Sequence, residues 1–507
     1  MQPQKIPSAW PKREALRVKG QFWTPDWVAD AMAAYVFAKT ADHLFDPAVG
    51  AGSLFQAAKR IAAPLQKSVA LYGNEIDEQA ITQARQSGLT DGDLANVELR
   101  DFALNPSSRR YQAIAANPPY IRHHRLPRDT KAALREFGAS LIGKPLDGRA
   151  GLHVYFLLRA LSLLEAGGRL AFIMPADTCE GVFAQTLWRW ITQRFRLDAV
   201  VTFSSAASPF PNVDTNAIIF LIENSPPATR FHWAQVESVD PHALTNWVAS
   251  VFMDSDSHAL TARERDLNEA LETGLSRCPV DARHEGATLG DFATVMRGIA
   301  TGANEFFFLT ARQAAALRIP YEFLIPAVGR TRDVASDEVT EATINELEQK
   351  GRPTRLFAPD GRPLDAFPQA VRDYLKQGEA MGIHQRTLIA TRRPWYKMES
   401  RSAPPFLFAY LGRRNVRFIR NTAKVIPLTG FLCIYPRLSV AADTEKLWQA
   451  LNHPDTIANL RLVGKSYGSG AIKVEPRALE RLPILSHVLA EAERLAAHRR
   501  AQLALSF

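Results

Sequence analysis

Short apolar segments alternate with segments of helical periodicity between residues 26 and 222, and this alternation constrains the fold more than any other feature. The pattern predicts helices over residues 26–39, 53–61, 78–86 and 152–164, and strands over residues 43–45, 68–72, 113–116, 169–174, 200–203 and 217–222. Strands that alternate with helices form a mostly parallel sheet with both faces covered. The expected fold class of this part is therefore α/β, with a Rossmann-like sheet.

The alternation fades after Trp233, where proline, arginine and aromatic residues become more frequent and helical pieces are joined by irregular connections. A chain of 507 residues is long enough for two or three domains. We therefore predict a first domain over residues 1–240, a connector over residues 241–285 that contains a polar helix at 263–273, and an α+β domain over residues 286–507.

The net charge and the cysteine content indicate the class of binding partner and the cellular compartment. The net charge of +9 favours a polyanionic partner, because Lys and Arg neutralise phosphates and release counterions. We see no run of 18 apolar residues that predicts a membrane span, and the polar N-terminus lacks the apolar centre of a secretory signal. Cys179, Cys278 and Cys433 lack metal-ligand spacing, so we expect no metal site, no disulfide framework and a reducing cytoplasm.

A glycine-containing turn, Asp46-Pro47-Ala48-Val49-Gly50-Ala51-Gly52-Ser53, joins the first predicted strand to the next helix. Ligands of open α/β sheets bind outside the carboxyl ends of the strands, and Gly50 and Gly52 would let the backbone approach such a ligand closely. The turn lacks the Gly-Lys-Ser/Thr ending of a phosphate loop, so a nucleotide phosphate is not the expected ligand. The alternative is a plain strand-to-helix turn.

Acidic residues follow the next two strands. Glu75 lies at the position past a glycine-rich turn where a carboxylate suits a ribose hydroxyl pair, whereas Asp77 precedes helix formers and is expected to cap that helix. Asp101 and Phe102 follow the segment 97–99. Asp101 would accept a hydrogen bond from an adenine amino group, and Phe102 would pack on the ring. These residue types suit the ribose and the base of a nucleoside.

The sequence Asn117-Pro118-Pro119-Tyr120 comes directly after an apolar run. Two successive prolines cannot extend a central strand, and they form a rigid turn whose carbonyls point outward. An adenine N6 amino group is a poor nucleophile because its lone pair is delocalised into the ring. The Asn117 side chain and the Pro118 carbonyl would accept hydrogen bonds from its two N–H groups. These hydrogen bonds would localise the lone pair for attack on a methyl group. Tyr120 would stack on the base, which is worth roughly 1–3 kcal/mol. A proline-rich surface turn is the alternative, and the same chemistry would serve cytosine N4.

Taken together, these residues resemble the gamma-class adenine-N6 DNA methyltransferases of type II restriction–modification systems. The family's motifs occur here in order, as Gln21-Phe22-Trp23-Thr24-Pro25, Asp46 to Gly52, Asn74-Glu75-Ile76-Asp77, Asp101-Phe102, Asn117 to Tyr120, Tyr155-Phe156, Ala171-Phe172-Ile173-Met174-Pro175, Pro209-Phe210-Pro211 and Thr215 to Phe220. The Thr-Pro motif at the N-terminus and target recognition at the C-terminus define the gamma order. This order, and not the turn at Asn117 alone, implies adenine as the target base.

The resemblance implies S-adenosylmethionine as the methyl donor. The residues implied to contact it are Thr24, Asp46, Pro47, Ala48, Gly50, Gly52, Glu75, Ile76, Asp101, Phe102, Asn117 and Phe156. The implied catalytic residues are Asn117, Pro118, Tyr120 and Phe210, with Phe210 stacking on the adenine opposite Tyr120. The family extrudes its target base from the duplex, at a cost of a few kcal/mol that the two aromatic rings would offset. The alternative for Phe210 is a buried loop aromatic.

The second half resembles the family's target-recognition domain more loosely, beginning with residues 295–307. Residues 386–424 are unusually basic, with aromatic residues among the basic ones and with Glu399 as the one acid. Basic residues would contact phosphates of double-stranded DNA, and a few arginines would contact guanine edges in the major groove. The alternative is a solvated basic face. The residues predicted to bind DNA are Arg392, Arg393, Lys397, Arg413, Arg414, Arg417, Arg420 and Lys473.

Other classes of protein are disfavoured by specific features. Protein-glutamine methyltransferases share the Asn-Pro-Pro-Tyr turn but lack a long basic second domain, and RNA adenine methyltransferases usually carry compact modules with exposed stacking aromatics. A cytosine-C5 enzyme needs a cysteine nucleophile, normally after a proline, and none of the three cysteines follows one. A non-enzymatic DNA-binding protein would not need the intact turn.

A fused nuclease is also disfavoured. The 20 residues before Gln21 are too few for a nuclease domain, and the rest shows no convincing Asp…Glu-x-Lys metal constellation. We therefore expect a monomeric methyltransferase in the cytoplasm of a bacterial or archaeal cell, associated with the nucleoid. A separately encoded restriction endonuclease would act on the same DNA site.

Overall fold

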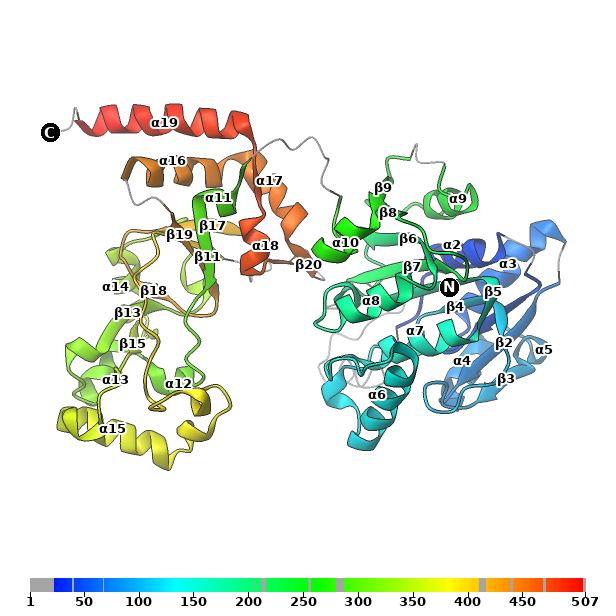
Figure 1. Ribbon diagram of the computed structural model, residues 1–507, viewed down its shortest axis with the longest axis horizontal. Coiled ribbons are helices and arrows are strands. Elements are labelled where there is room, and N and C mark those ends of the chain that lie inside the picture. The colour runs from blue at the N-terminus through cyan, green and yellow to red at the C-terminus, as the bar shows by residue number, and fades with distance from the viewer. Residues whose placement is uncertain are drawn as a thin grey trace. The chain divides into compact units, whose positions relative to one another are not determined.

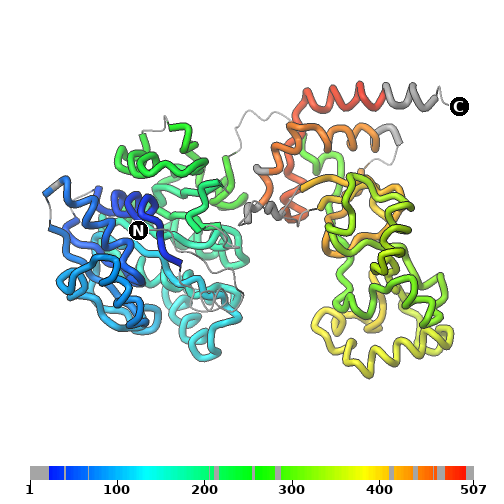
Figure 2. The backbone as a smooth tube through the Cα atoms, turned by 180° about the vertical axis from the view of Figure 1, so that it is seen from behind, coloured from blue at the N-terminus to red at the C-terminus, as the bar shows by residue number. Residues whose placement is uncertain are grey.

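The computed structural model describes residues 22–38, 41–66, 68–204, 206–210, 216–253, 257–279, 287–409, 416–437, 441–467 and 471–504. The chain divides into two compact units, which comprise Met1–Pro279 with Tyr467–Gly470, and Val280–Ser466 with Ala471–Phe507. Figures 1 and 2 show the elements of each unit from opposite sides.

The first unit is built on a nine-stranded sheet with the order β3-β2-β1-β4-β5-β7-β6-β8-β9. Its strands are β1 (His43–Asp46), β2 (Ala70–Glu75), β3 (Asn96–Leu99), β4 (Tyr111–Ala116), β5 (Leu164–Pro175), β6 (Arg196–Phe203), β7 (Ala217–Glu223), β8 (Arg230–Val236) and β9 (Leu260–Asp266). The strands from β3 to β5 pair in parallel, whereas β7 runs antiparallel to both β5 and β6. The predicted α/β class with a mostly parallel sheet is confirmed.

Helices cover both faces of this sheet, as Figure 1 shows. They are α2 (Asp26–Phe37), α3 (Ser53–Ala62), α4 (Glu78–Gln86), α5 (Asp91–Leu94), α6 (Arg128–Ile142), α7 (Leu152–Leu163), α8 (Ala184–Thr192), α9 (Ala243–Ala249) and α10 (Leu267–Thr273). Successive strand residues enter different cores: Phe172 packs with residues of α7 and α8, and Ile173 packs with residues of α2 and α3. Burial on both faces explains why a central strand such as β7 is almost wholly apolar.

The predicted helices and strands of this half are all present, with some ends shifted. The predicted helix at 78–86 has the bounds of α4, whereas the strand predicted at 169–174 is the middle of the longer β5. A strand's centre is apolar enough to recognise, but its ends depend on the pairing of its neighbours. Hydrogen bonds to β4 and β7 extend β5 in both directions.

The predicted connector was wrong in its structure. Residues 260–266 form β9, which pairs antiparallel with β8 as the edge strand of the sheet, and only residues 267–273 are helical. Arg265 explains the error, because it looks polar in sequence and yet is 2% exposed. Its guanidinium pairs with Glu269 and donates to the carbonyls of Gly274, Leu275 and Arg277, so a charged residue is built into the fold.

The second unit is α+β. A five-stranded sheet has the order β11-β19-β16-β17-β14, and a four-stranded sheet has the order β12-β15-β13-β18. The strands are β10 (Ala287–Thr288), β11 (Ala293–Arg297), β12 (Phe308–Leu309), β13 (Leu324–Val328), β14 (Glu338–Val339), β15 (Arg355–Phe357), β16 (Phe406–Ala409), β17 (Arg417–Asn421), β18 (Ile426–Pro427), β19 (Phe431–Pro436), β20 (Lys465–Tyr467), β21 (Ala471–Lys473) and β22 (Pro483–Ile484).

Helices of varied length accompany these sheets in the second unit. They are α11 (Leu289–Phe292), α12 (Asn304–Phe307), α13 (Ala311–Ala316), α14 (Glu341–Gln349), α15 (Gln369–Ala380), α16 (Ala441–Asn452), α17 (Pro454–Val463), α18 (Pro476–Glu480) and α19 (Ser486–Ala504). Among the residues described, no helix combines the length and the apolar character that crossing a membrane requires.

Candidate active site

The turn between β1 and α3 depends on its two glycines. Gly50 and Gly52 have φ angles of +55° and +79°, a region that favours glycine. A Cβ on Gly52 would also lie 2.2 Å from the Leu89 side chain. Gly73 in β2 leaves no room either, since its Cβ would lie 2.3 Å from Val49. The turn is thus packed tightly against the neighbouring strand, with its backbone exposed toward the carboxyl edge of the sheet.

The Glu75 carboxylate holds this turn to the next one. Its Oε2 accepts the Gly50 N–H at 2.8 Å, and its Oε1 accepts the N–H groups of Ile76 and Asp77 at 2.8 and 3.0 Å. Asp77 caps α4 by accepting the Gln79 N–H, so the predicted capping role is confirmed. Two acids that lie two residues apart therefore do different work: Glu75 faces the glycine turn and Asp77 faces the helix.

The Asp46 carboxyl is 1% exposed at the end of β1. Burial raises its pKa to about 8; the N–H of Ala48, 2.9 Å from Oδ1, opposes this shift, and the charge of Glu75 adds to it. A buried carboxyl with a perturbed pKa at the edge of a cleft is typical of a functional site. It would be stabilised in its charged form by a cationic ligand.

A cleft opens above these strand ends, wholly within the first unit. It is lined by Phe22, Trp23, Thr24, Asp46, Pro47, Ala48, Val49, Gly50, Ala51, Ser53, Leu54, Glu75, Ile76, Ala80, Gln83, Arg100, Asp101, Phe102, Asn117, Pro119, Ile121, Leu152 and Phe156. The structure therefore brings together all the residues predicted to contact the cofactor except Gly52. Gly52 does not line the cleft and packs close to Leu89 at the start of α3, so its contact with the cofactor stays a prediction.

Apolar surfaces of the cleft suit a flat ring. Ile76 is 74% exposed although it is an isoleucine, and it lines the cleft. Phe102 packs against Phe156 with ring centroids 5.3 Å apart, so the cleft wall behind it is rigid. The Asp101 Oδ1 accepts the N–H groups of Ala103 and Leu104, which fixes its carboxylate at the same edge.

The Asn117 amide is oriented by the segment that precedes α2. Its Nδ2 donates to the Phe22 carbonyl and, at 3.2 Å, to the Thr24 hydroxyl. Among the described residues, no hydrogen bond reaches Asn117 Oδ1 or the Pro118 carbonyl. The N-terminal segment thus turns the amide so that its oxygen stays available as an acceptor beside a second available carbonyl. Gln21 of the same motif lies outside the described residues.

Three aromatic rings gather next to this turn. Phe22 lies 5.8 Å from Tyr120 and 5.9 Å from Phe210, and the Tyr120 and Phe210 centroids are 6.2 Å apart. The Tyr120 hydroxyl donates to the Ile173 carbonyl, and burial, followed by the charge of Asp177, holds its pKa well above the usual value. The planes of Tyr120 and Phe210 are 85° apart, so the predicted stacking of both rings on opposite faces of one base does not describe this arrangement.

The basic residues predicted to bind DNA are mostly engaged within the second unit. Arg392 donates to the carbonyls of Ala300 and Thr301 and lies over the Phe307 ring. Arg417 pairs with Asp337, and Arg420 pairs with Glu445 at 2.7 Å. The guanidinium groups of these three arginines are held by the fold, and their contact with DNA stays a prediction.

The remaining predicted residues divide into two groups. Arg393 and Lys397 are exposed, although Arg393 also donates to the carbonyls of Ala390 and Arg392. Arg413 and Arg414 lie outside the described residues, as does the side chain of Lys473 in β21. Of the predicted DNA-binding side chains that can be placed, Arg393 and Lys397 are the ones that face solvent.

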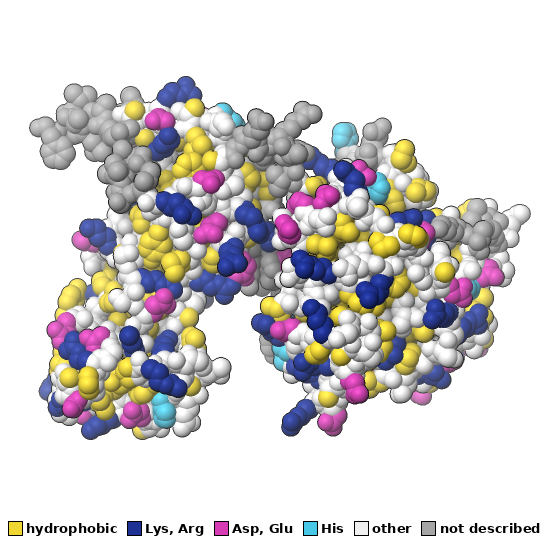
Figure 3. All heavy atoms as spheres, in the orientation of Figure 1, with side chains coloured by type: hydrophobic (Ala, Val, Ile, Leu, Met, Phe, Trp, Pro, Cys, Tyr) yellow, Lys and Arg dark blue, Asp and Glu magenta, His cyan; other side chains and the backbone are white. Residues whose placement is uncertain are grey.

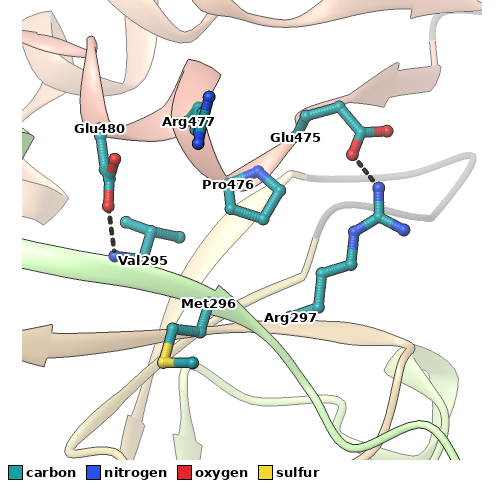
Figure 4. Close-up of a pocket in the computed structure, with 7 residues that line it drawn as sticks. All are labelled: Val295, Met296, Arg297, Glu475, Pro476, Arg477 and Glu480. Atoms are coloured by element: carbon teal, nitrogen blue, oxygen red, sulfur yellow. Dashed lines mark hydrogen bonds and ion pairs between the residues drawn. The ribbon is translucent and has the colours of Figure 1, made fainter. Parts of the chain in front are cut away.

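Figure 4 shows a shallow pocket in the second unit between β11 and α18. Arg297 pairs with Glu475 across it, and Glu480 accepts the Val295 N–H at 2.9 Å. These contacts place the segment that begins the predicted recognition domain on an edge strand beside a short helix. Met296 is 40% exposed on this strand. The pairing of both carboxylates indicates a structural junction.

A group of potential metal ligands in the second unit was missed by the sequence analysis. His453, Asp455 and His487 each bring a ligand atom within 4.8 Å of the others. However, His453 Nδ1 accepts the Asp455 N–H as a helix cap, and His487 Nε2 lies 2.8 Å from Asp455 Oδ2. These contacts engage one ring nitrogen of each histidine and one oxygen of Asp455, and none of the three residues lines the cleft.

The sheet, the glycine turn and the turn at Asn117 together define the catalytic unit of an S-adenosylmethionine-dependent methyltransferase. Residues 12–233 match the family model of the N-6 DNA methylases, and residues 273–504 match that of the C-terminal domain of the type II methyltransferase M.Eco57I. These two matches support an N6-adenine DNA methyltransferase of restriction–modification systems.

Relatives are similar along almost the whole chain. The type II methyltransferase M.AccI of Acinetobacter calcoaceticus is 26% identical, over 91% of this chain and 84% of the relative. M.XamI of Xanthomonas campestris pv. amaranthicola is also 26% identical, over 92% of this chain and 85% of the relative. The type IIL enzyme MmeI, solved in complex with DNA, has a similar fold, with a TM-score of 0.52 at 13% identity. The match covers 93% of this chain and 65% of MmeI, which is less than two thirds of that enzyme.

The cofactor is S-adenosylmethionine, and the cleft fits it on its own chemistry. Glu75 offers a carboxylate at the position that suits ribose hydroxyls, and the exposed Ile76 and the Phe102–Phe156 pair offer apolar surface for adenine. Buried Asp46 offers a carboxyl group whose charged form a cationic ligand would stabilise. Each of these groups is held by hydrogen bonds or packing before any ligand arrives.

Proposed function

We propose that the protein methylates the N6 atom of one adenine in a specific duplex sequence after that base has left the helix. The observation that carries this proposal is the orientation of Asn117: its Nδ2 is committed to Phe22 and Thr24, so its Oδ1 can accept from an amino group. The bound cofactor supplies an electrophilic methyl group on a sulfonium. The Asn117 Oδ1 and the Pro118 carbonyl accept hydrogen bonds from the two N6 N–H groups, which keeps the lone pair on nitrogen.

The N-terminal segment has a positioning role in this scheme. Without Phe22 and Thr24, the Asn117 amide could rotate and present its NH2 group, a donor, to another donor. A pair of donors facing each other would lose the hydrogen bond and repel. The segment that contains Phe22 and Thr24 is far from Asn117 in sequence. It lies beside the Asn117 turn because the following helix, α2, packs against α3 and β4. This accounts for the position of a Thr-Pro motif ahead of the glycine turn, and we infer the gamma class from that order.

The aromatic rings would receive the extruded base. Tyr120 is anchored by its hydroxyl, and the high pKa of that hydroxyl keeps it a hydrogen-bond donor and not a base. Because Phe210 stands at 85° to Tyr120, we propose that the base stacks on Tyr120 and meets Phe210 edge-on. Edge-to-face contacts are as favourable as offset stacking for aromatic pairs. Extrusion costs a few kcal/mol, which such contacts offset.

The second unit would recognise the target sequence. It comprises close to half of the chain, and its exposed cations Arg393 and Lys397 suit phosphate contacts. We propose that the protein acts as a monomer, protects its site from a separately encoded endonuclease, and works in the cytoplasm near the nucleoid. Relatives named as type II methyltransferases support the restriction–modification setting of this proposal.

The test is methylation-sensitive sequencing of DNA from cells that express the protein, beside cells that express Asn117→Ala. N6-methyladenine at one recurring sequence, absent from the variant, is the expected result. Methylation of cytosine N4, or of RNA or protein with no DNA mark, would overturn the proposal. Base extrusion is tested separately with 2-aminopurine at the target position, whose fluorescence rises when the base leaves the stack.

A further inference from the structure

A run of basic residues directly follows the catalytic turn Asn117–Tyr120 in the sequence. None of these residues was predicted above to bind DNA. We call it the basic rim and define it by Arg122, His123, His124, Arg125, Arg128 and Lys131. It comprises the short helix η2 (His123–Arg125) and the first turn of α6. Between residues 122 and 131 the only acid is Asp129, against four Lys or Arg.

Hydrogen bonds tie the rim to the active site. The Ile121 N–H donates to the Pro119 carbonyl at 2.9 Å, and the Ile121 carbonyl accepts the Leu152 N–H at 2.9 Å. Ile121 and Leu152 both line the cleft. Arg122 is therefore the first residue beyond the cleft wall, two positions after Tyr120. The rim thus follows directly on the turn that carries Asn117 and Tyr120.

The rim side chains face solvent. Arg122, His124, Arg125 and Arg128 are exposed, and His123 and Lys131 are half-buried. Figure 3 shows several Lys and Arg side chains around the part of the first unit that contains α6. The pKa of His123 is lowered, first by burial and then by the charges of Lys131, His124 and Arg149, while the charge of Asp147 opposes this shift. Cations of the rim therefore lie close enough to His123 to affect its charge.

Carboxylates elsewhere in the first unit neutralise the exposed arginines. Arg60 pairs with Asp30, Arg85 pairs with Asp91, and Arg230 pairs with Glu264. In the described part of the chain, no ion pair is formed by Arg122, Arg128 or Lys131. Arg128 and Lys131 also lie in the first turn of α6, where positive charge is unfavourable beside the helix dipole. Folding alone therefore does not account for these cations.

We propose that the basic rim binds the phosphates of the DNA strand that carries the target adenine and holds that backbone against the catalytic turn. The proposal deepens the proposed function and rests on it. Phosphate contacts position a duplex without selecting its sequence. The rim would thus supply sequence-independent binding on the catalytic unit, separate from the sequence recognition assigned to the second unit.

The test compares two variants of the full-length protein. Arg122→Gln with Arg128→Gln removes two rim charges and keeps hydrogen-bonding side chains of similar size. Arg110→Gln is the matched control, because Arg110 is exposed and lies just before β4, at the opposite end of the strand that leads into Asn117. Binding of non-cognate duplex DNA is titrated at several salt concentrations, and S-adenosylmethionine affinity and thermal stability are measured for each variant.

The double variant should flatten the plot of log K against log salt by about 1 for each phosphate that is no longer neutralised, or about 2 in all. Arg110→Gln should keep the wild-type slope, and cofactor affinity and melting temperature should stay unchanged in both. An unchanged slope in the double variant, or an equally flattened slope in Arg110→Gln, would overturn the proposal. Because binding and not methylation is measured, a protein that leaves adenine unmethylated refutes the proposed function without affecting this result.

Discussion

The two units hold their polar residues in different ways. In the first unit, Glu75, Asp101 and Asn117 bond to backbone groups or to Thr24 and still face a cleft. In the second unit, Arg417 and Arg420 are held by carboxylates of the same fold. Residue types at the ends of parallel strands therefore indicate a site, because topology brings those ends together. The number of charged residues in a segment does not indicate a site, because Lys and Arg occur both in ion pairs within the fold and on binding surfaces.

Among the variants that test this difference between the units, Asn117→Ala should have the largest effect, a loss of methyl transfer. Asn117→Ala should lower kcat for methyl transfer by at least about 10²–10³-fold, the reduction typical when one preorganised hydrogen-bonding group is removed from a transition state. Cofactor affinity, measured by calorimetry, should stay close to that of the wild type. Thr24→Val serves as the companion variant, since it removes one bond to Asn117 Nδ2 and should lower kcat by a smaller factor. Full activity of Asn117→Ala would contradict the mechanism.

The pH dependence of stability tests whether the buried Asp46 carboxyl of the first unit is protonated in the folded protein. The pKa of Asp46 is about 8 in the folded protein, against an ordinary value of 3.8 for an aspartate. The folded protein therefore keeps a proton that the unfolded chain has lost, so stability falls as pH rises between these values, by up to about 1.4 kcal/mol per pH unit. In Asp46→Asn this contribution disappears. Urea unfolding of the unliganded wild type and Asp46→Asn from pH 5 to pH 8 measures this contribution. If the free energy of unfolding depended on pH in the same way in both proteins, the raised pKa of Asp46 would be ruled out.

Much of the first unit could be predicted from sequence, for a physical reason. Both faces of its sheet are buried, so strands such as β7 are unbroken apolar runs, and glycine is required at Gly50 by its φ angle. Buried charges and ring orientations could not be predicted. Arg265 is 2% exposed because five hydrogen-bonding groups surround it, and the angle between Tyr120 and Phe210 depends on packing. In the second unit the pairing partners of the arginines lie far along the chain, where local pattern carries no information.

Glu75 and Asp77 provide a sharper comparison inside one turn. Glu75→Gln replaces one acceptor oxygen by an NH2 group opposite a backbone N–H, so the turn at Gly50 should loosen and cofactor Kd should rise about tenfold. Asp77→Ala is the matched control: it removes the cap of α4, which should cost about 1 kcal/mol of stability and leave cofactor affinity unchanged. Calorimetry and chemical unfolding separate the two effects. Equal cofactor affinities for Glu75→Gln and the wild type would remove Glu75 from the site.

Substitution of Arg420 should have the smallest effect on stability and on DNA binding. It tests whether the basic residues of the second unit stabilise the fold or bind DNA. Its guanidinium pairs with Glu445 and lies 4.8 Å from the centre of the Trp448 ring, in β17 of the five-stranded sheet. Arg420→Ala should lower stability by about 1 kcal/mol, because Glu445 loses a partly buried partner, and it should leave the salt dependence of DNA binding unchanged. Arg393→Ala with Lys397→Ala, two exposed cations, should behave in the opposite way, with stability kept and the slope reduced. If Arg420→Ala flattened the slope instead, the distinction between the two units would fail, since a residue paired within the fold would also bind DNA.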